Sequence, residues 1–128
     1  MIDHVSVTVR DLAAAARFYE AVLGALGLTK LVDRSPATVG FGRKYPEFWL
    51  NARPDMTAVD PDSGTHICLR ASGAAAIDAF HAAALRAGGT SDGAPGLRPD
   101  YTAGYYAAFV RDPEGNRIEA VTFETPRP

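Results

Sequence analysis

The sequence predicts an α+β fold built from two copies of one unit, in which a strand and a helix precede three further strands. The chain matches itself without a gap when segment 4–27 is laid on segment 66–89, an offset of 62 residues. The most distinctive identities pair His4 with His66, Phe18 with Phe80, Leu23 with Leu85 and Gly27 with Gly89. Each copy also changes from a period of two residues to a period of three to four. An internal duplication with this pattern predicts two equivalent modules.

The first expected element is a strand over residues 2–9. Val5, Val7 and Val9 alternate there with residues of the other side, which include His4. This period is typical of a strand with one buried face. We expect the valines to pack and His4 to lie on the opposite face.

A helix is expected next, from Leu12 to Leu26. Asp11 precedes it as an N-cap whose carboxylate can accept from free N–H groups of the first turn. Its apolar stripe consists of Leu12, Ala15, Ala16, Tyr19, Val22, Leu23 and Leu26. Gly27 is placed to end the helix in a left-handed conformation. The helix should cover the valine face of the first strand.

Three short strands complete the first module, and turn-forming residues separate them. They are expected at residues 29–34, 38–42 and 47–51. A polar connection at residues 57–63 follows. We therefore expect a single domain over 1–128, with modules at about 1–56 and 64–124.

The second module repeats this order with a less regular end. A strand at 65–71 has His66 and Cys68 on one side and Ile67 and Leu69 on the other. Ser72 is the expected cap of a helix at 73–87, which Gly88 and Gly89 end. The expected inward residues of this helix are Ile77, Phe80, Ala84 and Leu85.

The remaining segment is expected to hold an irregular strand and a hairpin. Glycine, proline and aspartate are frequent in residues 90–103, which indicates a strand around Leu97 and a long loop with Tyr101. The hairpin strands are expected at 105–111 and 117–123.

Composition restricts the class of partner. The net charge is −2, which gives no electrostatic attraction to nucleic acid or to an anionic membrane. No apolar run approaches the about 20 residues that span a bilayer. The single cysteine, Cys68, cannot form an internal disulfide, and we expect it to be a small packing residue. A small-molecule partner and a cytoplasmic location are the resulting expectations.

Three residues form the candidate chemical centre. If the helices cover the valine and isoleucine faces, His4, His66 and Glu119 all project from the other face of their strands. Two imidazoles and one carboxylate suit a divalent first-row metal with open coordination positions. A metal held in this way can polarise a carbonyl, acidify a neighbouring C–H group or, if it is iron, bind dioxygen.

Other residues are candidates for supporting roles. Tyr105 and Tyr106 begin the first strand of the closing hairpin and are candidate acids or bases, with Tyr101 in the preceding loop. Arg43 is a candidate for binding an anionic substrate. Most tyrosines of this kind pack, and most surface arginines are solvated, so these assignments depend on their nearness to the metal site.

The motifs that carry these residues resemble the vicinal oxygen chelate superfamily. The run from His4 to Leu12, the run Gly64-Thr65-His66-Ile67 and the closing run Asp112-Pro113-Glu114-Gly115-Asn116-Arg117-Ile118-Glu119 are similar to it. The superfamily includes glyoxalase I, extradiol dioxygenases, fosfomycin-resistance enzymes and bleomycin-resistance proteins.

The resemblance implies two βαβββ modules in an eight-stranded open cup, with one helix packed outside each sheet. The cup is often completed in a homodimer, which we therefore expect. His4, His66 and Glu119 match three ligand positions for a divalent metal, which is Zn, Ni, Mn or Fe(II). The implied function is a glyoxalase-like lyase or isomerase that chelates a small oxygenated substrate and transfers a proton.

One position departs from the glyoxalase I pattern, and it leaves two alternatives open. The fourth, carboxylate ligand of glyoxalase I falls on Phe48 or Trp49, or on Glu47 only if the register shifts. A three-ligand site resembles the Fe(II) extradiol dioxygenases. Phe48 and Trp49 also suit a metal-free cavity of the bleomycin-resistance type, in which Trp49 would stack on a planar ligand. The expected substrate-binding residues are Trp49, Phe48, Arg43 and Tyr101.

Overall fold

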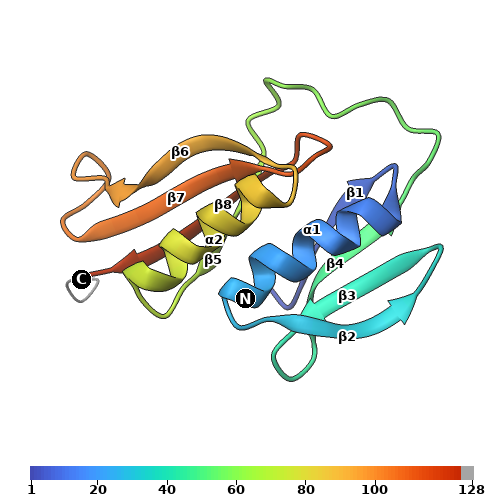
Figure 1. Cartoon of the computed structure of the whole chain (residues 1–128), viewed down its shortest axis with the longest axis horizontal. Coiled ribbons are helices and arrows are strands. Elements are labelled where there is room, and N and C mark those ends of the chain that lie inside the picture. Colours follow the sequence, from blue (N-terminus) through green and yellow to red (C-terminus); the bar gives the residue numbers. More distant parts are fainter. Residues whose placement is uncertain (125–128) are drawn as a thin grey trace.

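The computed structural model describes residues 1–124 and has an α+β architecture of two βαβββ modules (Figure 1). The first module contains β1 (Val5–Val9), α1 (Leu12–Ala25), β2 (Thr29–Arg34), β3 (Thr38–Gly42) and β4 (Pro46–Ala52). The second contains β5 (His66–Arg70), α2 (Ala74–Arg86), β6 (Thr90–Leu97), β7 (Tyr105–Arg111) and β8 (Arg117–Phe123). This arrangement confirms the predicted fold class.

The two sheets have the same topology. Their strand orders are β1-β4-β3-β2 and β5-β8-β7-β6, and the first strand of each module pairs parallel with the last. The other neighbours pair antiparallel. A helical crossover allows the parallel pair, and hairpin connections give the antiparallel ones. In consequence β1 and β5 are edge strands of separate sheets.

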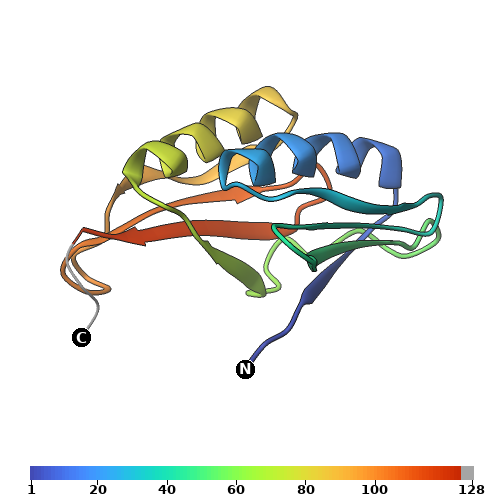
Figure 2. The same cartoon turned by 90° about the horizontal axis from the view of Figure 1, so that it is seen from below.

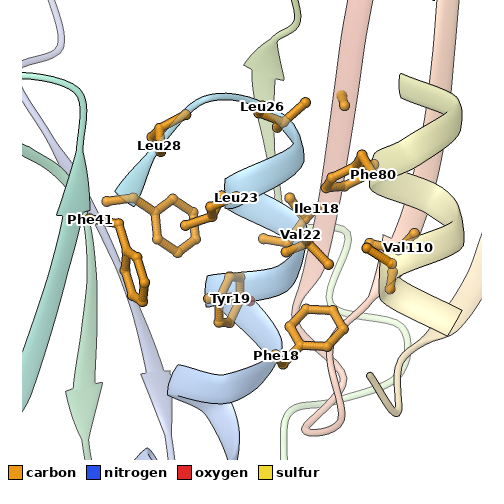
Figure 3. Close-up of a cluster of buried hydrophobic side chains, with 14 of the residues drawn as sticks. Phe18, Tyr19, Val22, Leu23, Leu26, Leu28, Phe41, Phe80, Val110 and Ile118 are labelled. Atoms are coloured by element: carbon orange, nitrogen blue, oxygen red, sulfur yellow. The ribbon is translucent and has the colours of Figure 1, made fainter. Parts of the chain in front are cut away.

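Both helices lie side by side on the same side of the two sheets (Figure 2). The core fills the space between helices and sheets, and Phe18, Tyr19, Val22, Leu23 and Phe80 meet there (Figure 3). Phe18 lies outside the predicted stripe of α1, yet it is fully buried. The reason is that α1 packs on α2 as well as on its own sheet, which widens its buried face.

The helix ends agree with the sequence in the first module and differ in the second. Asp11 caps α1 by accepting from the backbone N–H of Ala14 at 3.1 Å, and Gly27 adopts φ +84°. The Ser72 cap was a wrong prediction, because Gly73 occupies the N-cap of α2 without a side-chain hydrogen bond. The inward position of Leu85 was also wrong, since this residue is 47% exposed. Leu85 lies about 100° around the helix axis from the preceding residue, the buried Ala84, and therefore points away from the core.

The β7–β8 turn of the second module forms hydrogen bonds with the first module. The buried hydroxyl of Tyr19 in α1 donates to Asp112 Oδ2 at 2.7 Å. The Glu114 carboxylate accepts from the backbone N–H groups of Arg10 and Asp11 at 2.7 and 2.9 Å. These contacts place the start of α1 on the β7–β8 turn. Within residues 1–124, no helix is long and apolar enough to cross a membrane.

Candidate functional site

The candidate site lies on the face of the second sheet that α2 does not cover. Its centre is Glu119 of β8, which is only 3% exposed. Glu119 Oε1 lies 3.1 Å from His66 Nε2, and Glu119 Oε2 accepts a hydrogen bond from the Tyr105 hydroxyl. The buried carboxylate thus contacts an imidazole from β5 and a phenol from β7, the two strands that flank β8.

Strand register explains how these side chains meet. The β5–β8 register places Cys68 opposite Glu119, and the β7–β8 register places Phe109 opposite it. Tyr105 is four residues before Phe109 on β7, so its side chain must extend along the sheet to reach the carboxylate. The small residue Ala107 lies between them on the same face and leaves room for the ring.

The surroundings of Tyr105 keep its hydroxyl protonated. Burial raises the pKa of Tyr105 above the ordinary value, and the hydrogen bond to Glu119 and the nearby Cys68 thiol raise it further. At neutral pH the phenol is therefore a donor to Glu119 and not a base. Cys68 is exposed and does not pack in the core as we expected, because no helix covers this face of the sheet.

Aromatic rings surround the carboxylate on one side. Tyr101 meets Tyr105 and Phe109 edge-on, with centroid distances of 5.1 and 6.5 Å, and Tyr105 meets Phe123 at 5.3 Å. The Arg98 guanidinium lies 5.4 Å from the centroid of Phe109. Tyr101 is 60% exposed, so the cluster offers an open apolar surface next to a buried charge.

Within one chain the structure brings His66 and Glu119 together but does not bring His4 to them. His4 precedes β1, is exposed, and forms a 2.7 Å contact between Nδ1 and Asp3 Oδ1. Among residues 1–124, no three His, Cys, Asp or Glu side chains are grouped so that they could hold a metal. The physical reason is that the modules pack through their helices, which leaves β1 and β5 unpaired with each other.

The register also decides which residue of β4 is equivalent to Glu119. Trp49 pairs with Ser6 of β1, just as Glu119 pairs with Cys68 of β5, and Ser6 and Cys68 are related by the same offset of 62 residues. Trp49 is therefore the counterpart of the carboxylate, and Phe48 is not. Phe48 is 1% exposed and packs on Tyr19 in the core.

Two further candidates lie away from the His66–Glu119 pair. Tyr106 points to the helix side of β7 and donates to Asp78 of α2 at 2.6 Å, so of the two tyrosines only Tyr105 reaches the carboxylate. Arg43 donates to the Leu26 carbonyl at 3.3 Å and lines a separate cleft of about 180 Å³.

The His66–Glu119 pair fits part of a metal site. Two ligand atoms that each lie about 2.1 Å from a metal are about 3.0 Å apart at a right angle and about 3.4 Å apart at a tetrahedral angle. The observed 3.1 Å between His66 Nε2 and Glu119 Oε1 falls within this range. One nitrogen and one oxygen donor are also a suitable set for first-row divalent metals. Among residues 1–124, the pair is not joined by a third His, Cys, Asp or Glu ligand.

Sequence reasoning missed Cys68 and Phe109 as neighbours of the carboxylate. The signal for Cys68 was present, because it is two residues from His66 on the same face of one strand. Phe109 could not be found in this way, since its position opposite Glu119 depends on the register of the β7–β8 hairpin.

Comparison with known proteins places the chain in one superfamily. The family model of the Glyoxalase/Bleomycin resistance protein/Dioxygenase superfamily matches residues 1–120. The chain belongs to this superfamily.

Individual relatives agree with this membership. A glyoxalase/bleomycin resistance protein from Albidiferax ferrireducens T118 is 31% identical, with a TM-score of 0.80 over 93% of this chain and 96% of that one. A glyoxalase/bleomycin resistance protein/dioxygenase family enzyme from Burkholderia phytofirmans PsJN shares the fold at 21% identity, with a TM-score of 0.71 over 94% and 96% of the two chains. The "Virulence protein STM3117" of Salmonella typhimurium is 29% identical over 119 residues, which are 92% of this chain and 81% of that protein.

Proposed function

We propose that the protein is a metal-dependent, glyoxalase-like enzyme that acts on a small oxygenated substrate by chelation and proton transfer. The observation that carries this proposal is the 3% exposed Glu119 carboxylate, held between His66 Nε2 and the Tyr105 hydroxyl. A buried carboxylate is costly unless its charge is used or paired, and here it faces a side of the sheet that is open to ligands.

His66 and Glu119 Oε1 would hold the metal, which supplies Lewis-acid polarisation of a substrate oxygen. A third ligand is needed, and His4 of a second copy of the chain is the candidate. The His4 side chain is 54% exposed at the start of an edge strand, so it is free to reach a partner. The proposal therefore includes a homodimer whose site combines β1 of one copy with β5 and β8 of the other.

Glu119 Oε2 would accept the substrate proton, and the Tyr105 hydroxyl would donate a hydrogen bond. Glu119 Oε2 is the base that can accept a proton from a carbon next to the polarised carbonyl. Once Glu119 Oε2 is protonated, it no longer competes for the Tyr105 hydroxyl, which can then donate to the substrate oxygen that gains charge. The raised pKa of Tyr105 suits this role, because the phenol stays protonated until it is needed.

Metal content tests the proposal directly. The apoprotein is reconstituted with Zn, Ni, Mn or Fe(II), and bound metal is measured in the wild type, His66→Ala and Glu119→Gln. Tyr106→Phe is the matched control, because Tyr106 is on β7 but on the helix side. We expect both ligand variants to lose metal while the control retains it. Equal and negligible metal in all four proteins would refute the proposal.

The same ligands would serve an Fe(II) extradiol dioxygenase. Oxygen consumption by the Fe(II) protein with a panel of catechols distinguishes the two chemistries. Rapid uptake that Glu119→Gln abolishes would favour ring cleavage over the glyoxalase-like reaction.

A second candidate function is metal-free binding of a planar ligand, which the exposed aromatic cluster around Tyr101 favours. Trp49 lies on the uncovered face of the first sheet and is the only tryptophan, so its fluorescence can report a ligand. Quenching that is unaffected by chelators and by His66→Ala would support binding without metal.

A further inference from the structure

We propose that Arg117 anchors a carboxylate of the substrate beside the His66–Glu119 pair, so that the enzyme acts on a small monoanionic acid. This inference rests on the proposed function for the identity of the neighbouring centre. It concerns the side of that centre on which Arg117 lies.

Arg117 lies next to the site because of strand pairing. It is the direct partner of His66 across β5 and β8, and it is two residues from Glu119 on the same face. A cavity of about 130 Å³ is lined by His66, Arg117, Asp92 and Phe109. Liquid water occupies about 30 Å³ per molecule, so this space can take roughly four water-sized groups. A carboxylate and the carbon that bears it fit there.

The charges around the cavity leave Arg117 incompletely neutralised. Asp92 is the nearby carboxylate, but its closer partner is Arg111, with Nε to Oδ1 at 3.3 Å. The distance from Arg117 Nε to Asp92 Oδ2 is 3.8 Å, at which a hydrogen bond is not made. Two guanidinium groups therefore share one carboxylate, so these three side chains together carry a net charge of +1, without the Glu119 carboxylate, which lies beside His66.

The donors of Arg117 are also only partly used. Its Nη2 donates to the Pro61 carbonyl at 2.6 Å. Among residues 1–124, no acceptor forms a hydrogen bond with its Nη1. The side chain is 26% exposed, so its charge is partly desolvated and stronger than at a fully solvated surface. The planar fork of a guanidinium matches a carboxylate, which can accept from two of its N–H groups.

Asp92 selects the charge of the anion. A monoanion completes the charge balance of the two arginines and Asp92. A phosphate dianion would exceed that balance and would lie close to the Asp92 carboxylate, where like charges repel. The geometry thus favours a 2-hydroxy or 2-oxo acid, whose second oxygen would point from the Arg117 end of the cavity toward His66 and Glu119.

The test compares binding of small acids with their neutral amides by calorimetry or NMR titration. Lactate, pyruvate and mandelate are each paired with the corresponding amide, and inorganic phosphate is the dianionic probe. The proteins are the wild type, Arg117→Gln, Asp92→Asn and Arg86→Gln. Arg86 is exposed at the end of α2, so its substitution makes the same charge change away from the cavity.

We expect the wild type and Arg86→Gln to bind at least one acid about tenfold or more tightly than its amide, as a charge-assisted hydrogen bond predicts. Arg117→Gln should lose this preference. Asp92→Asn should strengthen acid binding and allow phosphate to bind, which a purely structural role for the cluster would not produce.

Four results would overturn the inference. They are no binding of any acid in the panel, equal binding of acids and amides, an acid preference that survives in Arg117→Gln, and tighter binding of phosphate than of every acid by the wild type. Metal content is measured on the same preparations. If the wild type binds no metal but prefers acids to amides, only the proposed function is refuted. If it binds metal but shows no preference for acids, only the carboxylate subsite is refuted.

Discussion

Replacing Tyr19 with phenylalanine tests whether the β7–β8 turn stabilises the contact between the modules. Tyr19 is fully buried in α1, and its hydroxyl donates to Asp112 Oδ2 at 2.7 Å. Asp112 is itself 4% exposed and belongs to the second module. The substitution removes one oxygen atom and keeps the ring, so the packing of Tyr19 on Phe18 and Phe48 remains.

The expected cost follows from what Asp112 retains. Its carboxylate still accepts from the backbone N–H groups of Glu114 and Asn116 and from the Asn116 side chain, each at 2.9 Å. The loss is therefore that of one hydrogen bond to a charged group, about 1.5–3 kcal/mol in the free energy of unfolding. An unfolding entropy of about 2.1 cal/mol/K per residue gives about 0.27 kcal/mol/K for 128 residues. The melting temperature should fall by about 6–11 °C.

Urea denaturation and thermal melting followed by circular dichroism measure this change. Tyr45→Phe is the matched control, because Tyr45 is 53% exposed and should change stability by less than about 0.5 kcal/mol. If Tyr19→Phe were as stable as Tyr45→Phe, the hydrogen bond between the modules would contribute nothing net, and the reasoning would be refuted.

Three further substitutions test local features. In Gly40→Ala, the new Cβ would lie 2.9 Å from two ring atoms of Trp49, so we expect a loss of about 1–3 kcal/mol in urea denaturation and a shifted Trp49 emission; an unchanged spectrum and stability would contradict this packing. Glu114→Gln places an amide against the backbone N–H groups at the start of α1, and should cost about 1–3 kcal/mol, measured in the same way; no loss would show that the carboxylate is not needed there. Because the folded pKa of Tyr105 is raised, its contribution to stability is complete below the unfolded value of about 10 and is lost as the pH rises toward the folded pKa. As the pH rises above about 10, the free energy of unfolding should therefore fall less in Tyr105→Phe than in the wild type. Urea denaturation at several pH values measures this difference, and identical pH profiles would exclude the linkage.

Part of the site was predictable because strand alternation is a local property. Val7 and Val9 of β1 are buried as predicted, whereas His4, which was expected within the strand, precedes it and is exposed. The same argument put His66 and Glu119 on one face of the second sheet, and the two side chains meet there. The choice between Tyr105 and Tyr106 was different, because it requires the register of the β7–β8 hairpin.

Local patterns in the sequence were enough to identify the duplication, the order of elements in the two modules, the faces of β1, β5 and β8 and the Asp11 cap. These depend on periods of two and 3.6 residues and on contacts within a few positions, which the order of residues encodes directly. For the counterpart of Glu119 in the first module, the sequence left Phe48 and Trp49 as alternatives, with Glu47 possible only if the register shifts.

How those parts combine depends on contacts between residues that are distant in the sequence. Pairing of Ser6 with Trp49 resolved the alternative in favour of Trp49, since register depends on hydrogen bonds between distant segments. Packing of α1 on α2, which buries Phe18, leaves β1 and β5 as edge strands of separate sheets, and among residues 1–124 His4 does not join His66 and Glu119 in one group. Contacts of this kind depend on how whole faces fit together, and no short stretch of sequence specifies that.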